Sequence, residues 1–178
     1  MTDYGPSPRD SAFDIRPHAF DPYAEPELFE GVLARRVAAF VIDLFIIAVP
    51  LAMASIFILM LGFLTLGLGW LLFHLLSPAA IVWALLYYGL TLDSPASTTI
   101  GMRMMGIEMR TWYGAPAYFL LGAGHAVVYW VTVAMLSPFI LLVGLFNARK
   151  RLLHDVLVGT VVINSAPQAA WMRARGSY

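Results

Sequence analysis

An aspartate inside a long apolar segment is the residue of this sequence best placed to do chemistry. Asp43 lies within "RRVAAFVIDLFII" (residues 35–47), and positions 44–92 then contain no Asp, Glu, Lys or Arg. A charged side chain at the centre of a membrane helix costs about 2.5–3.5 kcal/mol on insertion scales, so such residues usually pair with others or take part in function. Asp43 is therefore either a carboxylate that binds a cation or a proton, or a member of a fixed ion network.

The composition indicates an integral membrane protein. Of the 178 residues, 60% are hydrophobic and only 12% are charged, and the mean hydropathy is +0.76. Soluble domains are usually about half apolar and about one quarter charged. The formal net charge of zero gives no basic footprint for nucleic acid. The absence of cysteine excludes disulfides, thiol nucleophiles and cysteine-ligated metals.

The lengths of the charge-free runs predict how often the chain crosses the membrane. The run 44–92 has 49 residues, more than twice the ~20 that one helix needs to cross a bilayer. It predicts two helices, at about 35–60 and 70–92, with a glycine-rich turn at 61–70. The second run, 111–148, is shorter. Its residues 117–146 could form one long helix or a hairpin that turns near "MLSPF".

Basic residues favour the hairpin. They occur before the first run, between the two runs and after the second, and the positive-inside rule asks all three groups to face the cytoplasm. The fold class expected is all-α, a polytopic transmembrane bundle of four crossings in two hairpins, with both termini and the middle segment cytoplasmic. Three crossings would place "ARKR" outside. The basic residues are Arg35, Arg36, Arg103, Arg110, Arg149, Lys150 and Arg151.

The chain divides into three parts by composition. Residues 1–30 are acidic and rich in proline and predict a flexible tail, 31–165 form the membrane domain, and 166–178 form a C-terminal tail. Within the domain, the second half of "DSPASTTIGMRMMGIEMRTWYGAP" (93–116) predicts a short strand or a surface helix.

Three segments, in order along the chain, resemble the RDD family of membrane proteins: "RRVAAFVID" (35–43), "ASTTIGMRMMGIEM" (96–109) and "RKRLLHDVLVGTVVI" (149–163). The family is named for one arginine and two aspartates, which match Arg36, Asp43 and Asp155. The resemblance implies a membrane protein that transports ions or small solutes, with sodium/proton antiport suggested for some members. Where the family often carries a basic residue before its third hydrophobic segment, this sequence has only His125.

These charged residues predict one cluster near the cytoplasmic face. Arg36 and Asp43 share a helix face ~10 Å apart, and helical side chains lean toward the N-terminus, so the two should not pair directly. If the hydrocarbon begins near Val37, Asp43 lies ~9 Å deep and needs a partner from another segment. The cluster expected is Arg36, Asp43, Asp155 and one further arginine. Arg103 and His154 are the other candidate members. The cluster is either a fixed ion network or a cation or proton site.

No metal or cofactor site is predicted, and no enzyme. His154 and Asp155 are neighbours in sequence and do not share a helix face, whereas zinc needs three or four converging ligands. No nucleophile–base pair is visible either. Two functions stay open. One is a small transporter of cations, protons or small solutes in a bacterial inner membrane, working as a homo-oligomer. The other is an accessory or assembly subunit that packs against a larger membrane complex.

Overall fold

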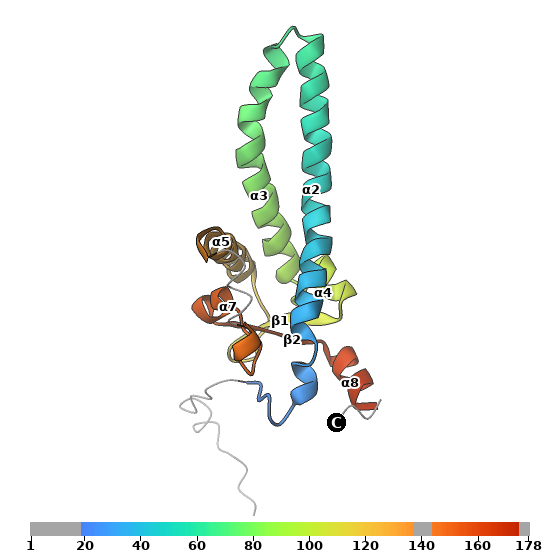
Figure 1. Ribbon diagram of the computed structural model, residues 1–178, viewed down its shortest axis with the longest axis vertical. Helices are drawn as coiled ribbons and strands as arrows, with labels where there is room; N and C mark the ends of the chain where they lie inside the picture. Colours follow the sequence, from blue (N-terminus) through green and yellow to red (C-terminus); the bar gives the residue numbers. More distant parts are fainter. Residues whose placement is uncertain (1–18, 137–143, 175–178) are drawn as a thin grey trace, which may run out of the picture.

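A long helical hairpin dominates the computed structural model, which describes residues 19–136 and 144–174. Helix α2 (Val32–Leu64) and helix α3 (Phe73–Leu92) run side by side away from the rest of the chain (Figure 1). Both are long and apolar enough to cross a membrane. The prediction of two long apolar helices in the first charge-free run is therefore confirmed.

The turn of the hairpin forms where the sequence places its glycines. The 3-10 helix η2 (Leu68–Leu72) follows Gly67, whose φ of +100° suits glycine. A Cβ on Gly69 would lie 2.7 Å from the carbonyl carbon of Leu61, so only glycine allows the two limbs to approach so closely. Thr65 Oγ1 accepts the Gly69 N–H at 2.7 Å and fixes the turn.

Helix α2 is longer than a bilayer is thick. Its 33 residues span about 50 Å, against about 30 Å of hydrocarbon. Counting back from Leu64, the charge-free residues 44–64 alone cover about 30 Å. If the hydrocarbon ends near Leu64, Asp43 lies close to its opposite boundary, whereas a hydrocarbon that begins near Val37 places Asp43 ~9 Å deep. In either case part of the 33-residue helix extends beyond the hydrocarbon.

The described chain is mostly helical, as predicted, and a small two-stranded sheet at the base of the hairpin is the departure from the all-α class. Strands β1 (Ile107–Thr111) and β2 (Thr160–Asn164) pair antiparallel, with Ile107 opposite Asn164 and Thr111 opposite Thr160. Helix α7 (Leu153–Val158) ends at Gly159, whose φ is +75°, and the β-branched "TVVI" that follows favours a strand. The middle segment supplies the short strand that was one of its two predicted forms.

Two apolar clusters hold the base together. The larger joins the start of α2 and the end of α3 to the sheet and to helix α4 (Ile100–Met104). Its buried members are Val32, Ala39, Leu92, Met102, Ile107, Met109, Ala117 and Val162.

The second apolar cluster extends the folded part beyond both predicted domain boundaries. Leu28 and Phe29, next to the 3-10 helix η1 (Pro26–Leu28), pack against β2 and helix α8 (Ala166–Ala174). Arg173 Nε also donates to Glu27 Oε1 at 2.5 Å. Of the predicted tails, residues 1–18 and 175–178 lie outside the described part.

Helix α5 (Phe119–Leu136) lies across the base of the hairpin. Figure 1 views it nearly end-on while α2 and α3 run vertically, so it is steeply inclined to both. A Cβ on Gly122 would lie 2.9 Å from Leu92 Cβ, which shows how closely α5 approaches α3. The predicted turn of a second hairpin falls at 137–143, outside the described residues. The four crossings are therefore not confirmed, since two of the described helices have the length and composition to span.

Candidate binding site at the base of the hairpin

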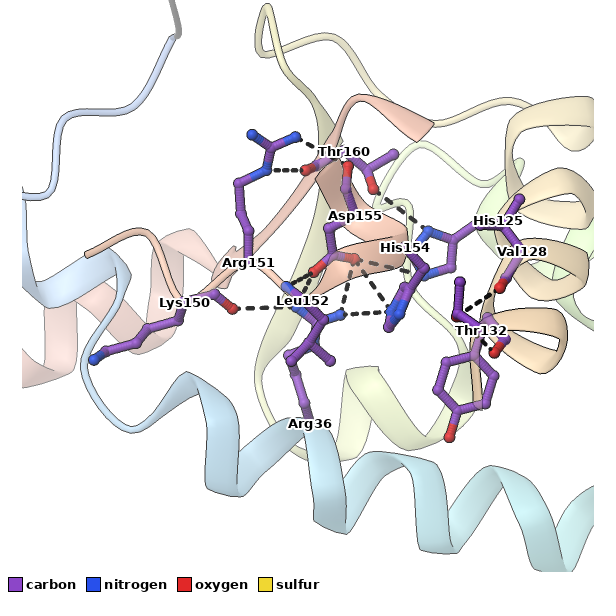
Figure 2. A network of polar contacts seen from close by, with 11 residues as sticks. Arg36, His125, Val128, Thr132, Lys150, Arg151, Leu152, His154, Asp155 and Thr160 are labelled. Carbon is purple, nitrogen blue, oxygen red and sulfur yellow. Dashed lines mark hydrogen bonds and ion pairs between the residues drawn. The ribbon is translucent and has the colours of Figure 1, made fainter. Parts of the chain in front are cut away.

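Arg36 and Asp155 form a bidentate ion pair between α2 and α7. Arg36 Nη1 lies 2.5 Å from Asp155 Oδ2, and Nη2 lies 2.9 Å from Oδ1 (Figure 2). The Asp155 side chain is fully buried, and that of Arg36 is 12% exposed. The backbone N–H of Leu152 also donates to Asp155 Oδ2, at 2.8 Å. Every oxygen of this carboxylate therefore has a donor, as a buried charge requires.

Arg151 holds the backbone around this pair. Its Nε donates to the Thr160 carbonyl and its Nη2 to the Asp155 carbonyl, both at 2.9 Å (Figure 2). These bonds join the end of α7 to the start of β2. The guanidinium also lies 3.9 Å from the ring centroid of Trp112, within the range of a cation–π contact.

The electrostatics of the pair favour its charged form. Burial alone raises the pKa of Asp155, but the Arg36 guanidinium outweighs burial and holds that pKa well below its usual range. Burial lowers the pKa of His154 to about 4, against the opposing effect of the Asp155 charge. His154 is therefore neutral at pH 7.

Two histidines complete this network. His125 Nε2 on α5 lies 3.7 Å from Asp155 Oδ1, and His154 Nε2 lies 3.5 Å from the same atom. The two rings meet edge to face at 4.8 Å between centroids. His125 Nδ1 lies 3.4 Å from Thr160 Oγ1, whereas His154 Nδ1 is buried without a hydrogen-bond partner among the described residues.

Geometry alone would allow a metal ion here. Ligand atoms of His125, His154 and Asp155 all lie within 4.8 Å of one another, because α5 brings in the histidine that the sequence placed in a separate segment. The Arg36 guanidinium, however, occupies both oxygens of Asp155 and puts a positive charge where a cation would bind. A metal would have to displace Arg36, so the arrangement favours an ion pair.

Asp43 lies in a second polar site made of neutral donors. The residue is 3% exposed. Its carboxylate accepts hydrogen bonds from Tyr87 Oη at 2.5 Å, Thr99 Oγ1 at 2.6 Å and the Gly101 N–H at 2.8 Å. The donors come from α3 and from the first turn of α4, so Asp43 joins α2 to both. A Cβ on Gly101 would lie 2.2 Å from the Ala39 carbonyl oxygen, and only glycine permits this approach.

The single cluster predicted from the sequence is therefore two sites. Arg36, His154 and Asp155 come together as expected, but Asp43 binds hydroxyl and amide donors in place of an arginine. Arg103 belongs to neither site: it is exposed on α4, with its Nε 3.4 Å from Thr98 Oγ1. Asp43 needs no arginine partner because neutral donors already satisfy its carboxylate. A count of charged residues in the sequence does not include such donors.

A cavity of about 540 Å³ joins the two sites. Arg36, His125 and His154 line it from the ion-pair side, and Asp43 lines it from the other. Most of the remaining wall is apolar. The main apolar and aromatic lining residues are Leu33, Val37, Phe40, Val41, Tyr88, Leu92, Met102, Ala126, Tyr129, Val133 and Val162.

Sequence reasoning missed several residues of these sites. No prediction from the sequence placed Tyr87 or Thr99 against the Asp43 carboxylate. The available signal was the "STTIG" stretch, where a threonine before a helix start can cap it; Thr99 Oγ1 indeed accepts the Met102 N–H at 3.0 Å. Nothing in the sequence alone pointed to the meeting of His125 with His154.

The apolar hairpin extends from a base that contains the charged residues. This arrangement is that of an integral membrane protein. The chain belongs to the RDD family, whose sequence model matches residues 31–159. The matched region contains Arg36, Asp43 and Asp155, so the resemblance predicted from three motifs is confirmed. No curated protein and no solved structure matches the chain.

Proposed function

We propose that this protein transports small cations, protons or small solutes across the inner membrane of a bacterium, with Asp43 as the exchange site. The observation that supports this proposal best is the cavity of about 540 Å³ that reaches Asp43. An ionisable residue in a membrane helix, facing a cavity, is a common feature of substrate and ion pathways. The Arg36–Asp155 pair would hold the base in shape around it.

The three hydrogen-bond donors of Asp43 are compatible with exchange. The hydroxyls of Tyr87 and Thr99 donate to the carboxylate, and hydroxyl oxygens can also act as ligands of a hard cation. An arriving cation would meet the carboxylate and these oxygens together. A proton would instead neutralise Asp43 and weaken its bonds to α3 and α4. The protonation of Asp43 would thus be coupled to the contact of α2 with α3 and α4.

A complete pathway would need more than one copy of the chain. Residues 44–92 contain no Asp, Glu, Lys or Arg, so a single hairpin offers a small ion few charged groups to bind above Asp43. We therefore expect an oligomer whose hairpins enclose the rest of the path. The basic residues on α2, α4, β1 and the segment before α7 all belong to the base, which supports a cytoplasmic base under the positive-inside rule.

An accessory subunit is the second candidate, and the exposed hairpin favours it. Large apolar side chains around both helices are more than half exposed, a surface that either lipid or another membrane protein would cover. Examples are Phe45, Met53, Phe57 and Phe63 on α2, and Leu75, Ile81 and Leu90 on α3.

Proton movement in everted membrane vesicles tests the first candidate. Sodium or potassium is added to energised vesicles that contain the wild type, Asp43→Asn, or the control Asp93→Asn, in equal amounts of folded protein. Asp93 is an exposed carboxylate at the end of α3. We expect the cation to collapse the pH gradient with the wild type and with Asp93→Asn but not with Asp43→Asn.

Two results would count against transport of these ions. If the wild type moves no protons, antiport of sodium and potassium is excluded, and co-purifying partners become the next measurement. If Asp43→Asn fails to accumulate while Asp93→Asn does, Asp43 serves to hold the fold.

A further inference from the structure

We infer that the cavity at the base binds a lipophilic organic cation, an ammonium or related ion with an apolar or aromatic body, with its charge at Asp43. This inference rests on the proposed role of Asp43 and names the substrate class of that site. Four observations carry it: the size of the cavity, its charge, its aromatic lining and a buried imidazole nitrogen without a partner.

The size of the cavity exceeds what an inorganic ion needs. Pockets for drug-sized organic molecules have volumes of about 300–1,000 Å³, and 540 Å³ lies within this range. A bare sodium or calcium ion is instead held by several oxygens in direct contact. The wall here is mostly apolar, as it is in pockets that bury the body of an organic ligand.

The charge of the lining selects a cation. The positive charge of Arg36 is matched by its bidentate contact with Asp155, and the two histidines contribute no full charge at pH 7. The hydrogen-bond donors that contact Asp43, from Tyr87, Thr99 and Gly101, are all neutral, so its carboxylate supplies the unmatched charge of the cavity. An anion would meet this carboxylate without compensation, whereas an ammonium would complete the pair.

Aromatic rings in the cavity wall suit an organic cation. Phe40, Tyr88 and Tyr129 line the cavity, and the rings of Phe40 and Tyr129 lie 5.5 Å apart. The faces of such rings attract ammonium groups, by about 2 kcal/mol or more where water is excluded. A hydrated inorganic ion gains less from an apolar and aromatic wall.

The far end of the cavity offers a second polar contact. His154 lines the cavity and is 1% exposed, and its Nδ1 has no hydrogen-bond partner among the described residues. A buried polar atom without a partner is costly; because this nitrogen has almost no accessible surface, a ligand would bond to it only after the ring rotates, and the bond would remove that cost. Arg36 and Asp43 lie ~10 Å apart along α2, a length that a small organic molecule spans and a single ion does not.

Binding of radiolabelled tetraphenylphosphonium to the full-length purified protein tests the inference. The variants are Asp43→Asn, which removes the charge, and Val133→Phe, which reduces the cavity volume and keeps Asp43. Asp93→Asn is the matched control. Size-exclusion elution reports whether each variant is folded. We expect saturable binding, at least about tenfold weaker in Asp43→Asn and in Val133→Phe, and unchanged in Asp93→Asn.

Competition experiments distinguish the effect of the ligand's charge on binding from the effect of its hydrophobic body. Benzyltrimethylammonium should displace the probe, whereas phenylacetate, an anion with a similar body, should not. The inference is overturned if the probe does not bind saturably, if folded Val133→Phe binds as tightly as the wild type, or if phenylacetate competes equally. Sodium-driven proton movement without probe binding would refute the organic cation and leave the proposed function intact. Probe binding that depends on Asp43, without any proton movement, would support the site and count against antiport.

Discussion

Arg36 and Asp155 lie 119 residues apart in the chain, and the guanidinium of one contacts both carboxylate oxygens of the other. The contact joins the first turns of the membrane hairpin to the last helix before β2. It sets the position of α7, and thereby of His154, on the wall of the cavity. We therefore propose that the Arg36–Asp155 pair has a structural role and that Asp43, with its neutral donors, is the group available to a ligand.

Removing Arg36 should strongly destabilise the protein. Arg36→Ala leaves a fully buried carboxylate without its counter-charge, and breaking a buried pair in this way costs about 3–5 kcal/mol. The measurement is the melting temperature of the purified protein and its yield in the membrane. Arg103→Ala is the control, because Arg103 is exposed, and it should melt close to the wild type. Equal melting of the two variants would contradict the structural role of the pair.

Acidification should destabilise the protein through His154. Its pKa is about 6.5 in an unfolded chain and about 4 in the folded protein, so the unfolded state binds the proton more readily. The stabilising effect of the neutral ring is therefore complete above pH 6.5 and is lost as the pH falls toward 4. The difference between the pKa of His154 in the two states corresponds to about 3 kcal/mol at most.

Melting temperatures between pH 7 and pH 4.5 measure this effect. The wild type should become less stable across that window, and His154→Gln, which cannot titrate, should show a shallower dependence. His74→Gln is the control, because that histidine lies on the hairpin, at the start of α3. If the slope is the same in the wild type and His154→Gln, His154 is not the titrating group.

Gly101→Ala should disturb the contact between α4 and α2. The added methyl group would lie 2.2 Å from the Ala39 carbonyl oxygen and 2.8 Å from Asp43 Oδ1. Backbone must move to relieve this overlap, so a loss of about 1–3 kcal/mol is expected. Gly124→Ala is the matched control, because a Cβ there meets nothing within 4 Å. Thermal unfolding of the two alanine variants tests the difference, and similar stability in both would contradict the close approach.

Thr99→Val should cost two hydrogen bonds at once. Thr99 Oγ1 donates to Asp43 and accepts from the Met102 N–H, so valine leaves a buried carboxylate oxygen and a helix start without this partner. A loss of about 1–3 kcal/mol is expected, measured as a lower melting temperature. Thr99→Ser keeps the hydroxyl and should recover most of the stability. A serine variant as unstable as the valine variant would indicate that the methyl group matters more.

The parts of the fold that depend on local pattern could be predicted from the sequence. The charge-free run 44–92 and its three turn glycines predicted the hairpin, because length and hydropathy suffice for a spanning helix. The sheet could be predicted only in part. Both strands contain β-branched or apolar residues typical of strands. Their pairing, however, joins residues far apart in the sequence: Met109 and Val162, for example, are 53 positions apart. No local pattern encodes such a pairing.

The site was harder to predict for the same reason. Charge counting found Arg36, Asp43 and Asp155, since ionisable residues in apolar surroundings are conspicuous. It then assigned Asp43 an arginine partner, because neutral donors such as Tyr87 and Thr99 have no sequence signal that separates them from other polar residues. The division into two sites depends on three-dimensional contacts that only the packing of α3, α4 and α7 creates.

Proton movement per folded molecule tests most directly whether Asp43 is the exchange site while the Arg36–Asp155 pair has a structural role. The comparison is between Arg36→Lys, which retains a charge opposite Asp155, and Asp43→Asn in the same everted vesicles. We predict less folded protein for Arg36→Lys but movement per molecule within about twofold of the wild type, since lysine keeps the charge and loses only the bidentate geometry. Asp43→Asn should accumulate and move no protons. Wild-type proton movement by folded Asp43→Asn, or loss of proton movement in folded Arg36→Lys, would contradict these two roles.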